Sequence, residues 1–428
     1  MRPLKFLHLT DLYAPSIGGM EFHIQRLTQE RARRGHQVSI LTISTNGESG
    51  LEVTEEGVRV HRIAGGLNRL GVGWGSSDKP QHPPAPDLII AREIRRVIDE
   101  EQPDVIHAHN WIVYSYLAIK KQGDPPVVYM QHDYALACPK KTALFEPSGS
   151  ICDGPSLMKC LGCSKHQYGR AKGALVTIGH KVSNAVLHNR IDRIVANSEF
   201  TAHFAAKSFS PKLPIEVVGS FISDDAAQVA EETTRPDYLP KDGTYILYVG
   251  ALGTHKGVYD LIEAYESLGE DRPPLVVLGS PKDDMPKSWP KGTIVREKVP
   301  NSEVMSAWRN CAFGVIPSKW AEPLGLVAVE AGAVSKAVIA TDAGGLRDVV
   351  LHEQTGLLVP PGDPKALATA MMRLIDNPGL AEKLGRAALK QSKKFRCRVV
   401  TDLLDKIAFE TIGIETEITE KEFVTTSP

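Results

Sequence analysis

Two glutamates late in the chain have a spacing suited to binding an activated sugar. Glu322 and Glu330 flank a helix start that is formed by Pro323, Leu324, Gly325 and Leu326. The free N–H groups and the positive dipole end of a helix start favour an anion such as a diphosphate. The first carboxylate can accept hydrogen bonds from sugar hydroxyls, and the deeper one can accept them from a ribose. The pattern predicts a site for a nucleotide diphosphate sugar. The alternative is two solvated carboxylates that stabilise the helix dipole.

Lys256 is placed to neutralise the phosphates of such a ligand. It follows a predicted strand over 244–250 and lies in a turn that contains Gly250 and Gly257. A lysine in that turn can stabilise a departing diphosphate as negative charge develops on it. The alternative is a surface lysine at the start of a helix.

Two histidines end predicted strands in the first half of the chain. His109 ends the strand at 104–109, and His132 ends the strand at 126–132. Because ligands bind beyond the carboxyl ends of strands in α/β folds, both are candidates for a site, and so is Asp133. A histidine there can equally be a satisfied polar residue. The aspartate can either bind acceptor hydroxyls or cap a turn.

Gly18 and Gly19 lie in the loop between the first predicted strand, 5–10, and the first predicted helix, 20–34. Glycine lets the backbone approach a phosphate without a Cβ clash. A Gly-Gly pair by itself is more often only a turn. Because this pair follows the first strand of an α/β domain, we expect it to contact the ligand.

Strands alternate with helices through both halves of the chain, which predicts parallel sheets with helices on both faces and an α/β fold. An acidic, proline-containing stretch at 219–242 separates the halves. We expect two Rossmann-like, doubly wound domains, 1–219 and 220–395, and a helical segment at 396–428. Ligands are expected in the cleft between two such domains. The predicted strands are 5–10, 37–43, 58–63, 104–109, 126–132, 191–196, 244–250, 275–279, 314–317, 337–341 and 357–359.

The order of these features resembles the GT-B glycosyltransferases, most closely the retaining enzymes of glycosyltransferase family 4 (glycosyl transferases group 1). The resemblance covers nearly the whole chain. It is carried by the glutamate pair and its spacer, by Gly250 with Lys256 and Gly257, and by Gly18 with Gly19. It implies two Rossmann-like domains that face each other across a cleft. The first would hold the acceptor and the second the nucleotide sugar, and the last helical segment would cross back to the first domain.

The resemblance also implies roles for individual residues. Glu322 would contact the donor sugar near its anomeric carbon, Glu330 would bind the ribose, and Lys256 would face the diphosphate. His132 would point toward the reacting sugar, so His132, Glu322 and Lys256 form the expected catalytic set. The backbone near Val299 would hold the base. The residues expected at the donor are Gly18, Gly19, Lys256, Val299, Glu322, Pro323, Leu324, Gly325, Leu326 and Glu330.

One position departs from the family pattern. Family members commonly carry an arginine one residue after the glycine that ends the strand before Lys256, and this chain has Ala251 there. A second phosphate-binding cation is therefore missing at its usual place. His255 or a basic residue elsewhere could replace it.

These expectations describe a retaining glycosyltransferase that moves a sugar from a UDP- or GDP-sugar to an acceptor hydroxyl. The acceptor would be a glycan, a glycolipid or a small molecule, and the resemblance implies chemistry without a catalytic metal. One alternative is a nucleotide-sugar epimerase or a sugar-phosphate synthase on the same fold. Another is a degenerate protein that binds nucleotide sugars without turnover, which Ala251 would explain.

Four cysteines lie close together in the sequence: Cys138, Cys152, Cys160 and Cys163. The last two form a Cys-x-x-Cys pair of the type that binds structural zinc. The surrounding segment lacks clear periodicity and predicts a loop, which would gain order from a metal. The alternatives are reduced thiols in an acceptor-side loop or a labile disulfide. Cys311 and Cys397 are expected to be isolated buried thiols.

Composition limits the classes of partner. With 50 Lys and Arg against 51 Asp and Glu, the net charge is −1, so no global field attracts nucleic acid. No run reaches the roughly 18 apolar residues of a membrane span, and a polar break comes too early for a signal peptide. We expect a cytoplasmic protein with at most peripheral contact to the inner membrane face. The run from Arg26 to Arg34 either forms a membrane-surface patch or complements the end of its helix.

Overall fold

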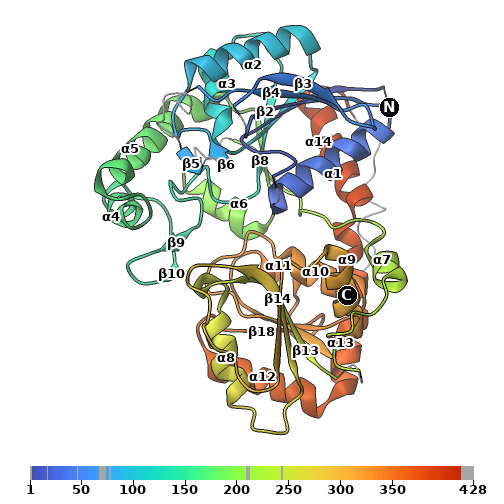
Figure 1. Ribbon diagram of the computed structural model, residues 1–428. Helices are drawn as coiled ribbons and strands as arrows, with labels where there is room; N and C mark the ends of the chain where they lie inside the picture. The colour runs from blue at the N-terminus through green and yellow to red at the C-terminus, as the bar shows by residue number, and fades with distance from the viewer. Residues whose placement is uncertain are drawn as a thin grey trace. The chain divides into compact units, whose positions relative to one another are not determined.

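The computed structural model describes residues 2–16, 18–45, 47–66, 74–76, 79–208, 213–241 and 244–415. Contacts divide the chain into two compact units (Figure 1). Unit 1 consists of Met1–Pro147, Cys152–Gly219 and Val400–Pro428, and unit 2 consists of Ser148–Ile151 and Ser220–Val399.

Unit 1 is built on an eight-stranded sheet in the order β12-β11-β8-β7-β1-β2-β4-β3. Neighbouring strands are parallel except β3, which is antiparallel to β4. The strands are β1 (Lys5–Thr10), β2 (Gln37–Ile43), β3 (Gly50–Val53), β4 (Arg59–Ile63), β7 (Val105–His109), β8 (Val127–Gln131), β11 (Arg193–Ala196) and β12 (Ile215–Val217). Among the described residues the chain also has two two-stranded sheets, β5 (Trp74–Ser76) with β6 (Lys79–Gln81) and β9 (Leu144–Phe145) with β10 (Ser150–Ile151).

The central strands of unit 1 explain its helical layers. β7 and β8 are buried at every position, and β1 is buried from its second residue onward. Such strands need apolar cover on both faces, which crossover helices supply. The helices are α1 (Gly19–Arg33), α2 (Leu88–Glu101), η2 (Asn110–Ile112), α3 (Val113–Ile119), α4 (Leu157–Tyr168), α5 (Arg170–Leu187), η3 (His188–Arg190), α6 (Glu199–Ala206) and, from Val400 onward, α14 (Cys397–Thr411).

Unit 2 contains a six-stranded, entirely parallel sheet in the order β15-β14-β13-β16-β17-β18. The strands are β13 (Ile246–Leu252), β14 (Leu275–Pro281), β15 (Thr293–Glu297), β16 (Phe313–Ile316), β17 (Val338–Thr341) and β18 (Leu357–Val359). The helices are α7 (Ala226–Glu232), η4 (Thr254–Lys256), α8 (Val258–Glu266), α9 (Asn301–Asn310), α10 (Leu326–Ala333), α11 (Leu346–Val349), α12 (Pro364–Asp376), α13 (Pro378–Ser392) and η5 (Lys393–Phe395).

The order of the strands indicates one expected ligand-binding position in each sheet. The first strand of each unit, β1 or β13, lies inside its sheet, with the next strands on one side and the later strands on the other. The order reverses between β1 and β7 in unit 1 and between β13 and β16 in unit 2. Ligands of doubly wound folds bind beyond the carboxyl ends of the strands at such a reversal.

The α/β fold with parallel sheets is confirmed, and each predicted strand lies within a few residues of an observed one. The pattern missed the edge strands β3, β12 and β15, and it missed the short strands β5, β6, β9 and β10. It was wrong about the cysteine-containing segment, where α4 and α5 replace much of the expected loop. Among the described helices, none combines the length and apolar composition that crossing a bilayer requires.

Candidate active site

Glu322 lies just beyond the carboxyl end of β16 and is buried, with 6% of its surface exposed. Its Oε1 accepts hydrogen bonds from Lys256 Nζ at 2.7 Å and from the hydroxyl of Ser318. Burial acts to raise the pKa of Glu322, but the charge of Lys256 and these hydrogen bonds outweigh it and hold the pKa below its ordinary value. The carboxylate is therefore ionised at neutral pH and forms a salt bridge with Lys256.

The backbone of Glu322 is held against a glycine that no other residue could replace. Glu322 and Gly344 form an isolated parallel bridge, and Gly345 donates its N–H to the Glu322 carbonyl at 2.7 Å. Gly344 has a φ of 65°, and a Cβ there would lie 2.3 Å from the Glu322 carbonyl oxygen. Any side chain at this position would displace the glutamate.

Lys256 reaches Glu322 because η4 packs closely against the end of β16. Gly257 follows η4 with a φ of 71°, and a Cβ on it would lie 1.8 Å from the carbonyl oxygen of Pro317. The N–H of Lys319 donates to the carbonyl of His255 at 2.9 Å and ties the two turns together. The close approach fixes the origin of the lysine side chain, so the salt bridge is built into the turn geometry.

The helix start between the two glutamates is open to a ligand. Gly325 is the N-cap of α10, and it has no side chain to accept a hydrogen bond from the first turn. Leu324 is buried beneath this turn, while Pro323 and Leu326 are partly exposed. The N–H groups of the first turn can therefore serve an anion, as at other helix starts.

Glu330 is the fifth residue of α10, a little more than one turn into the helix. It is partly buried, and its Oε1 is 3.5 Å from Nδ2 of Asn301, the first residue of α9. Burial raises the pKa of Glu330 to about 7, against the opposing effect of hydrogen bonds from Asn301 and Trp308. The carboxyl group is therefore close to half-protonated at neutral pH. A ligand that donates two hydroxyls to it would favour the ionised form.

A cavity of about 250 Å³ opens at the carboxyl ends of β13 and β14. Lys298 and Val299, which lead into α9, line it together with Ala251 on β13. Asn301 follows closely in sequence and contacts Glu330, so the cavity and Glu330 belong to the same region of unit 2. Lys298 supplies a cation next to the position where Ala251 has none.

Three adjacent strands of unit 1, β8, β7 and β1, end in polar residues. His132 follows β8, His109 is the last residue of β7, and Asp11 follows β1. Asp11 is buried and accepts the N–H of Ile112 at 3.1 Å. Burial raises its pKa to about 6, although Lys141 opposes the shift. Sequence reasoning missed Asp11, even though its place directly after a strand is the signal that identified both histidines.

Asp133 caps a turn. Its Oδ1 accepts the N–H of Ala135 at 2.7 Å, and burial raises the pKa of the carboxyl group. This geometry matches the second of the two interpretations that the sequence left open, an aspartate that stabilises the local backbone.

A continuous series of hydrogen bonds, the histidine chain, runs from His132 into the interior of unit 1. His132 Nε2 is 2.8 Å from His109 Nδ1, and His109 Nε2 is 3.1 Å from His8 Nδ1. His8 Nε2 is 3.2 Å from a terminal nitrogen of Arg31, whose Nε donates to Asp405 at 2.7 Å. Burial lowers the pKa of His8 and His109 well below the ordinary value, and it lowers the pKa of His132 to about 4. The three rings are therefore neutral at physiological pH.

Arg31 determines which nitrogen of each ring carries the proton. A guanidinium group can only donate, so His8 accepts at Nε2 and carries its proton on Nδ1. His8 donates that proton to His109 Nε2, and His109 therefore carries its own proton on Nδ1 and donates it to His132 Nε2. His132 is left with its proton on Nδ1, so it faces its surroundings as a hydrogen-bond donor.

Three arginines of the run at the end of α1 are paired with carboxylates. Arg31, Arg33 and Arg34 all make salt bridges within unit 1, Arg31 to Asp405 at 2.7 Å and Arg34 to Asp402 at 2.6 Å. Carboxylates therefore neutralise these three cations, and the hypothesis of a membrane-surface patch here stays a prediction.

Gly18 and Gly19 differ in what surrounds them. Gly18 is the N-cap of α1, and a Cβ on it would lie 2.2 Å from the carboxylate of Glu21. Gly19 is the first residue of the helix, and a Cβ on it would meet nothing within 4 Å. Contact between this glycine pair and a phosphate stays a prediction.

The four cysteines of the segment are free thiols, and Cys160 and Cys163 lie on α4. Burial raises the pKa of Cys160, and the nearby thiols of Cys152 and Cys163 raise it further. Across the described residues, no three of these sulfur atoms lie within 4.8 Å of one another. A shared zinc ion would therefore require the side chains to move closer together.

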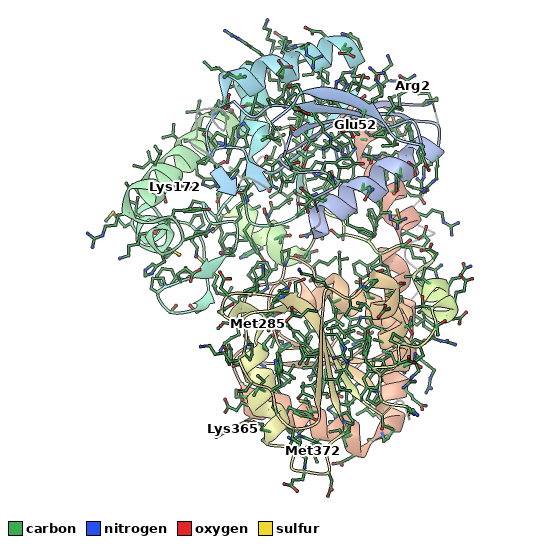
Figure 2. The ribbon with its side chains drawn as sticks, in the orientation of Figure 1. Arg2, Glu52, Lys172, Met285, Lys365 and Met372 are labelled. Atoms are coloured by element: carbon green, nitrogen blue, oxygen red, sulfur yellow. The ribbon has the colours of Figure 1, made fainter. Side chains whose placement is uncertain are left out.

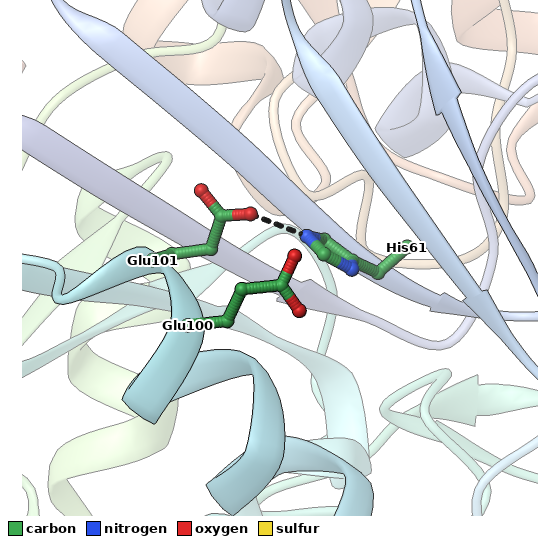
Figure 3. Close-up of side chains that lie close together, drawn as sticks. All are labelled: His61, Glu100 and Glu101. Carbon is green, nitrogen blue, oxygen red and sulfur yellow. Dashed lines mark hydrogen bonds and ion pairs between the residues drawn. The ribbon is translucent and has the colours of Figure 1, made fainter.

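His61, Glu100 and Glu101 form another group of potential metal ligands in unit 1 (Figure 3). Oε1 of Glu101 lies 2.7 Å from His61 Nε2 and also accepts from Arg59 Nε at 2.7 Å. Arg59 pairs in addition with Glu100 at 3.0 Å. Because Arg59 supplies a positive charge to both carboxylates, the group is an ion-pair network that needs no cation.

Two family models match the chain in tandem. The model described as Glycosyltransferase Family 4 matches residues 17–226, and the model described as Glycosyl transferases group 1 matches residues 230–391. The glycogen synthase of Mycobacterium tuberculosis is 28% identical over 407 residues, which cover 90% of this chain and 89% of that protein. The D-inositol 3-phosphate glycosyltransferase of Kineococcus radiotolerans is 27% identical over 427 residues, with 91% and 90% covered.

Solved structures share the fold. Sucrose-phosphate synthase from Thermosynechococcus elongatus superposes with a TM-score of 0.69 at 18% identity, covering 95% of this chain and 98% of that chain. HepE of Anabaena, solved in complex with UDP and glucose, superposes with a TM-score of 0.63 at 16% identity, covering 95% and 100%. At such identities the likeness concerns the arrangement of helices and strands.

Proposed function

The chain belongs to glycosyltransferase family 4, and we propose that it is a retaining enzyme that uses a UDP- or GDP-sugar. It would move the sugar to a hydroxyl of a glycan, a glycolipid or a small molecule. The observation that carries the proposal is the buried salt bridge between Lys256 and Glu322, which lies beside the open start of α10. A cation and an ionised carboxylate at that place suit a diphosphate and the hydroxyls of a sugar.

The donor would occupy the carboxyl edge of the unit 2 sheet. Its diphosphate would lie at the first turn of α10 and draw Lys256 away from Glu322, so that the carboxylate becomes available to the sugar hydroxyls. The ribose would bind Glu330, and the base would fill the cavity beside Val299. Lys298, which lines that cavity, would supply the second cation that Ala251 does not.

Retention would follow from reaction on one face of the sugar. As the bond to the leaving phosphate breaks, an oxocarbenium-like sugar forms. The departing phosphate oxygen accepts the proton of the acceptor hydroxyl on that same face. The protein would contribute position and charge, because Lys256 stabilises the leaving diphosphate. From unit 1, His132 would donate from Nδ1 to the donor sugar or the acceptor, and Gly18 and Gly19 would approach the diphosphate.

Binding and turnover are tested separately. A thermal-shift screen with UDP-, GDP-, ADP- and dTDP-sugars should reveal one preferred donor, and calorimetry should show that Glu330→Ala weakens binding much more than it alters the fold. With that donor and candidate acceptors, the proposal requires free nucleotide together with a new glycoside of retained configuration. An altered nucleotide sugar without a glycoside would indicate an epimerase. Binding without turnover for every acceptor would indicate a degenerate protein.

A structural zinc ion on Cys138, Cys152, Cys160 and Cys163 is a separate proposal from the sequence pattern. It is supported by the four free thiols of this segment, two of which lie on α4. Metal analysis of the purified protein should find about one zinc per chain. A folded protein that contains no zinc would rule this site out.

A further inference from the structure

Helix α5 exposes an apolar stripe on the side opposite its buried face. Leu175, Ile178, Val182 and Val186 are 61%, 51%, 56% and 61% exposed. Their spacing places them on one side of the helix, because each residue advances by about 100°. On α4, which packs against α5, Met158 is 78% exposed. This concentration of large exposed aliphatic side chains on neighbouring helices is more than scattered surface residues would give.

The same two helices form a purely basic stretch of the chain. Between Asp153 and Asp192 there is no aspartate or glutamate, although the whole chain contains 51. The stretch carries six cationic side chains, namely Lys159, Lys165, Arg170, Lys172, Lys181 and Arg190. Figure 2 marks Lys172 on α5. Lys159 pairs with Asp153, whereas no salt bridge among the described residues involves Lys165, Arg170 or Lys181.

We propose that the face formed by α4 and α5 binds the surface of a bilayer that contains anionic lipids. A helix that presents an aliphatic stripe with lysine and arginine beside it lies in the interface plane, with the stripe among the acyl chains and the cations at the phosphates. A second copy of this chain fits less well, because two identical faces would bring like charges together around a shared apolar contact.

A recess beside the stripe suits a lipid phosphate. A cavity of about 240 Å³ is lined by the first turn of α4, by the second half of α5 and by Lys207. Lys181 and Leu157 line it as well. Cationic and apolar residues therefore meet at the point where a headgroup and its chain would be expected.

Vesicle flotation tests the proposal without a need for donor or acceptor, so it can fail independently of the proposed function. The full chain should float with phosphatidylcholine vesicles that contain about 30% phosphatidylglycerol, and not with phosphatidylcholine alone. Binding should weaken when salt rises from about 0.1 M to about 0.5 M. The double variant Ile178→Glu with Val182→Glu should lower the bound fraction at least about tenfold, and Lys181→Glu should lower it less. Met372→Glu, an exposed apolar position on α12 of unit 2, is the matched control and should bind like the wild type.

Three results would overturn the proposal. The first is a wild-type protein that does not float with the anionic vesicles. The second is a double variant that floats as well as the wild type does. The third is a wild-type dimer in light scattering that the double variant splits into monomers, since the face would then be occupied by a second copy. Because the substituted side chains are exposed, circular dichroism should report unchanged melting for each variant.

Discussion

The carboxyl edges of the two sheets present different kinds of polar group. In unit 2 the edge is charged: Lys256 and Glu322 form a buried salt bridge, and Glu330 titrates at a pKa of about 7. In unit 1 the histidines at the edge are neutral: burial keeps His109 and His132 uncharged, and their protons are fixed in position. Both edges lie where a doubly wound fold binds its ligands. The chain therefore uses charge in one unit and hydrogen-bond direction in the other.

This difference fits the division of labour in the proposed reaction. A diphosphate needs a cation, because negative charge grows on it as it leaves. An acceptor hydroxyl is uncharged and needs a donor or acceptor of hydrogen bonds at a defined angle. In unit 1 the direction of these hydrogen bonds is set by Arg31, which is buried and paired with Asp405. Arg31 fixes the tautomer of His8 and, through it, that of the next histidine rings. The two edges can be tested by removing the group on which each depends.

Arg31→Met should give the largest effect, because it leaves the buried carboxylate of Asp405 without its main partner. Removing one member of a buried ion pair costs about 3–5 kcal/mol. We expect that loss in the free energy of unfolding from denaturant titrations. Arg33→Met is the control, since Arg33 lies on the same helix but forms a surface salt bridge with Glu56. Its loss should be below about 1 kcal/mol. Equal losses for the two variants would show that Arg31 is not the anchor of the histidine chain.

Lys256→Gln should abolish most activity with less change in stability. It keeps a polar side chain of similar length but removes the charge that would face the leaving diphosphate in the proposed reaction. Loss of one such group typically lowers kcat/KM by about 100-fold to 1,000-fold. Lys319→Gln is the matched control in unit 2, where the lysine pairs with Asp260 at 3.1 Å, and its kcat/KM should stay close to the wild-type value. Steady-state kinetics with the preferred donor distinguishes the two. A similar decline in both variants would argue for a general effect of charge.

The sequence predicted the fold well where the pattern is local. β2 and β18 have the predicted bounds because buried runs of Val, Ile and Leu define a strand by themselves. α4 and α5 were missed because small residues and glycines weaken their periodicity, and packing between the two helices supplies the missing stability. Short edge strands such as β12 carry too little pattern to be recognised.

Part of the candidate site could also be predicted, because it depends on local sequence pattern. Strand-end positions can be read from sequence, so Lys256, Glu322 and the two histidines were identified, although their roles stay predictions. The salt bridge between Lys256 and Glu322 could not be foreseen, because it depends on the close approach of Gly257 to Pro317. The histidine chain was also hidden. His8 and Arg31 face the interior from a strand and a helix, and only the tertiary structure brings them together.

His109→Phe tests the neutral edge and should have a smaller effect than loss of Lys256. The phenyl ring fills a similar space but has no nitrogen atoms, so it cannot accept a hydrogen bond from His8 or donate one to His132. The tautomer of His132 is then no longer fixed by His8. We expect kcat to fall about tenfold, with little change in KM for the donor. His203→Phe, at an exposed position on α6, should be silent. Nitrogen NMR of the wild type should show the His132 proton on Nδ1, and in His109→Phe it should shift toward Nε2. A wild-type proton on Nε2 would contradict the assigned direction of the chain.

Glu330 offers the smallest effect, which is a dependence on pH. Its pKa rises from an ordinary value of 4.5 to about 7 on folding because the carboxyl group is buried. Between these values the folded chain holds a proton that the unfolded chain releases, so this contribution to stability is complete below about pH 4.5 and is lost as pH rises through about 7. Glu330→Gln removes that loss and should raise the free energy of unfolding at pH 8 by about 1–2 kcal/mol.

The donor should respond to the same titration in the opposite direction. Because the ionised carboxylate is the better acceptor for ribose hydroxyls, calorimetry should show affinity for the preferred nucleotide sugar rising about threefold to tenfold between about pH 6 and about pH 8. A nucleotide sugar is the right probe, since its diphosphate, unlike that of a free nucleotide, does not titrate in this range. Glu330→Gln should bind weakly and with no such slope. Glu330 does not hold the ribose if the wild-type affinity is independent of pH, or if the variant keeps the pH dependence. In unit 2 the Lys256–Glu322 pair would then be the remaining charged group proposed to bind the donor.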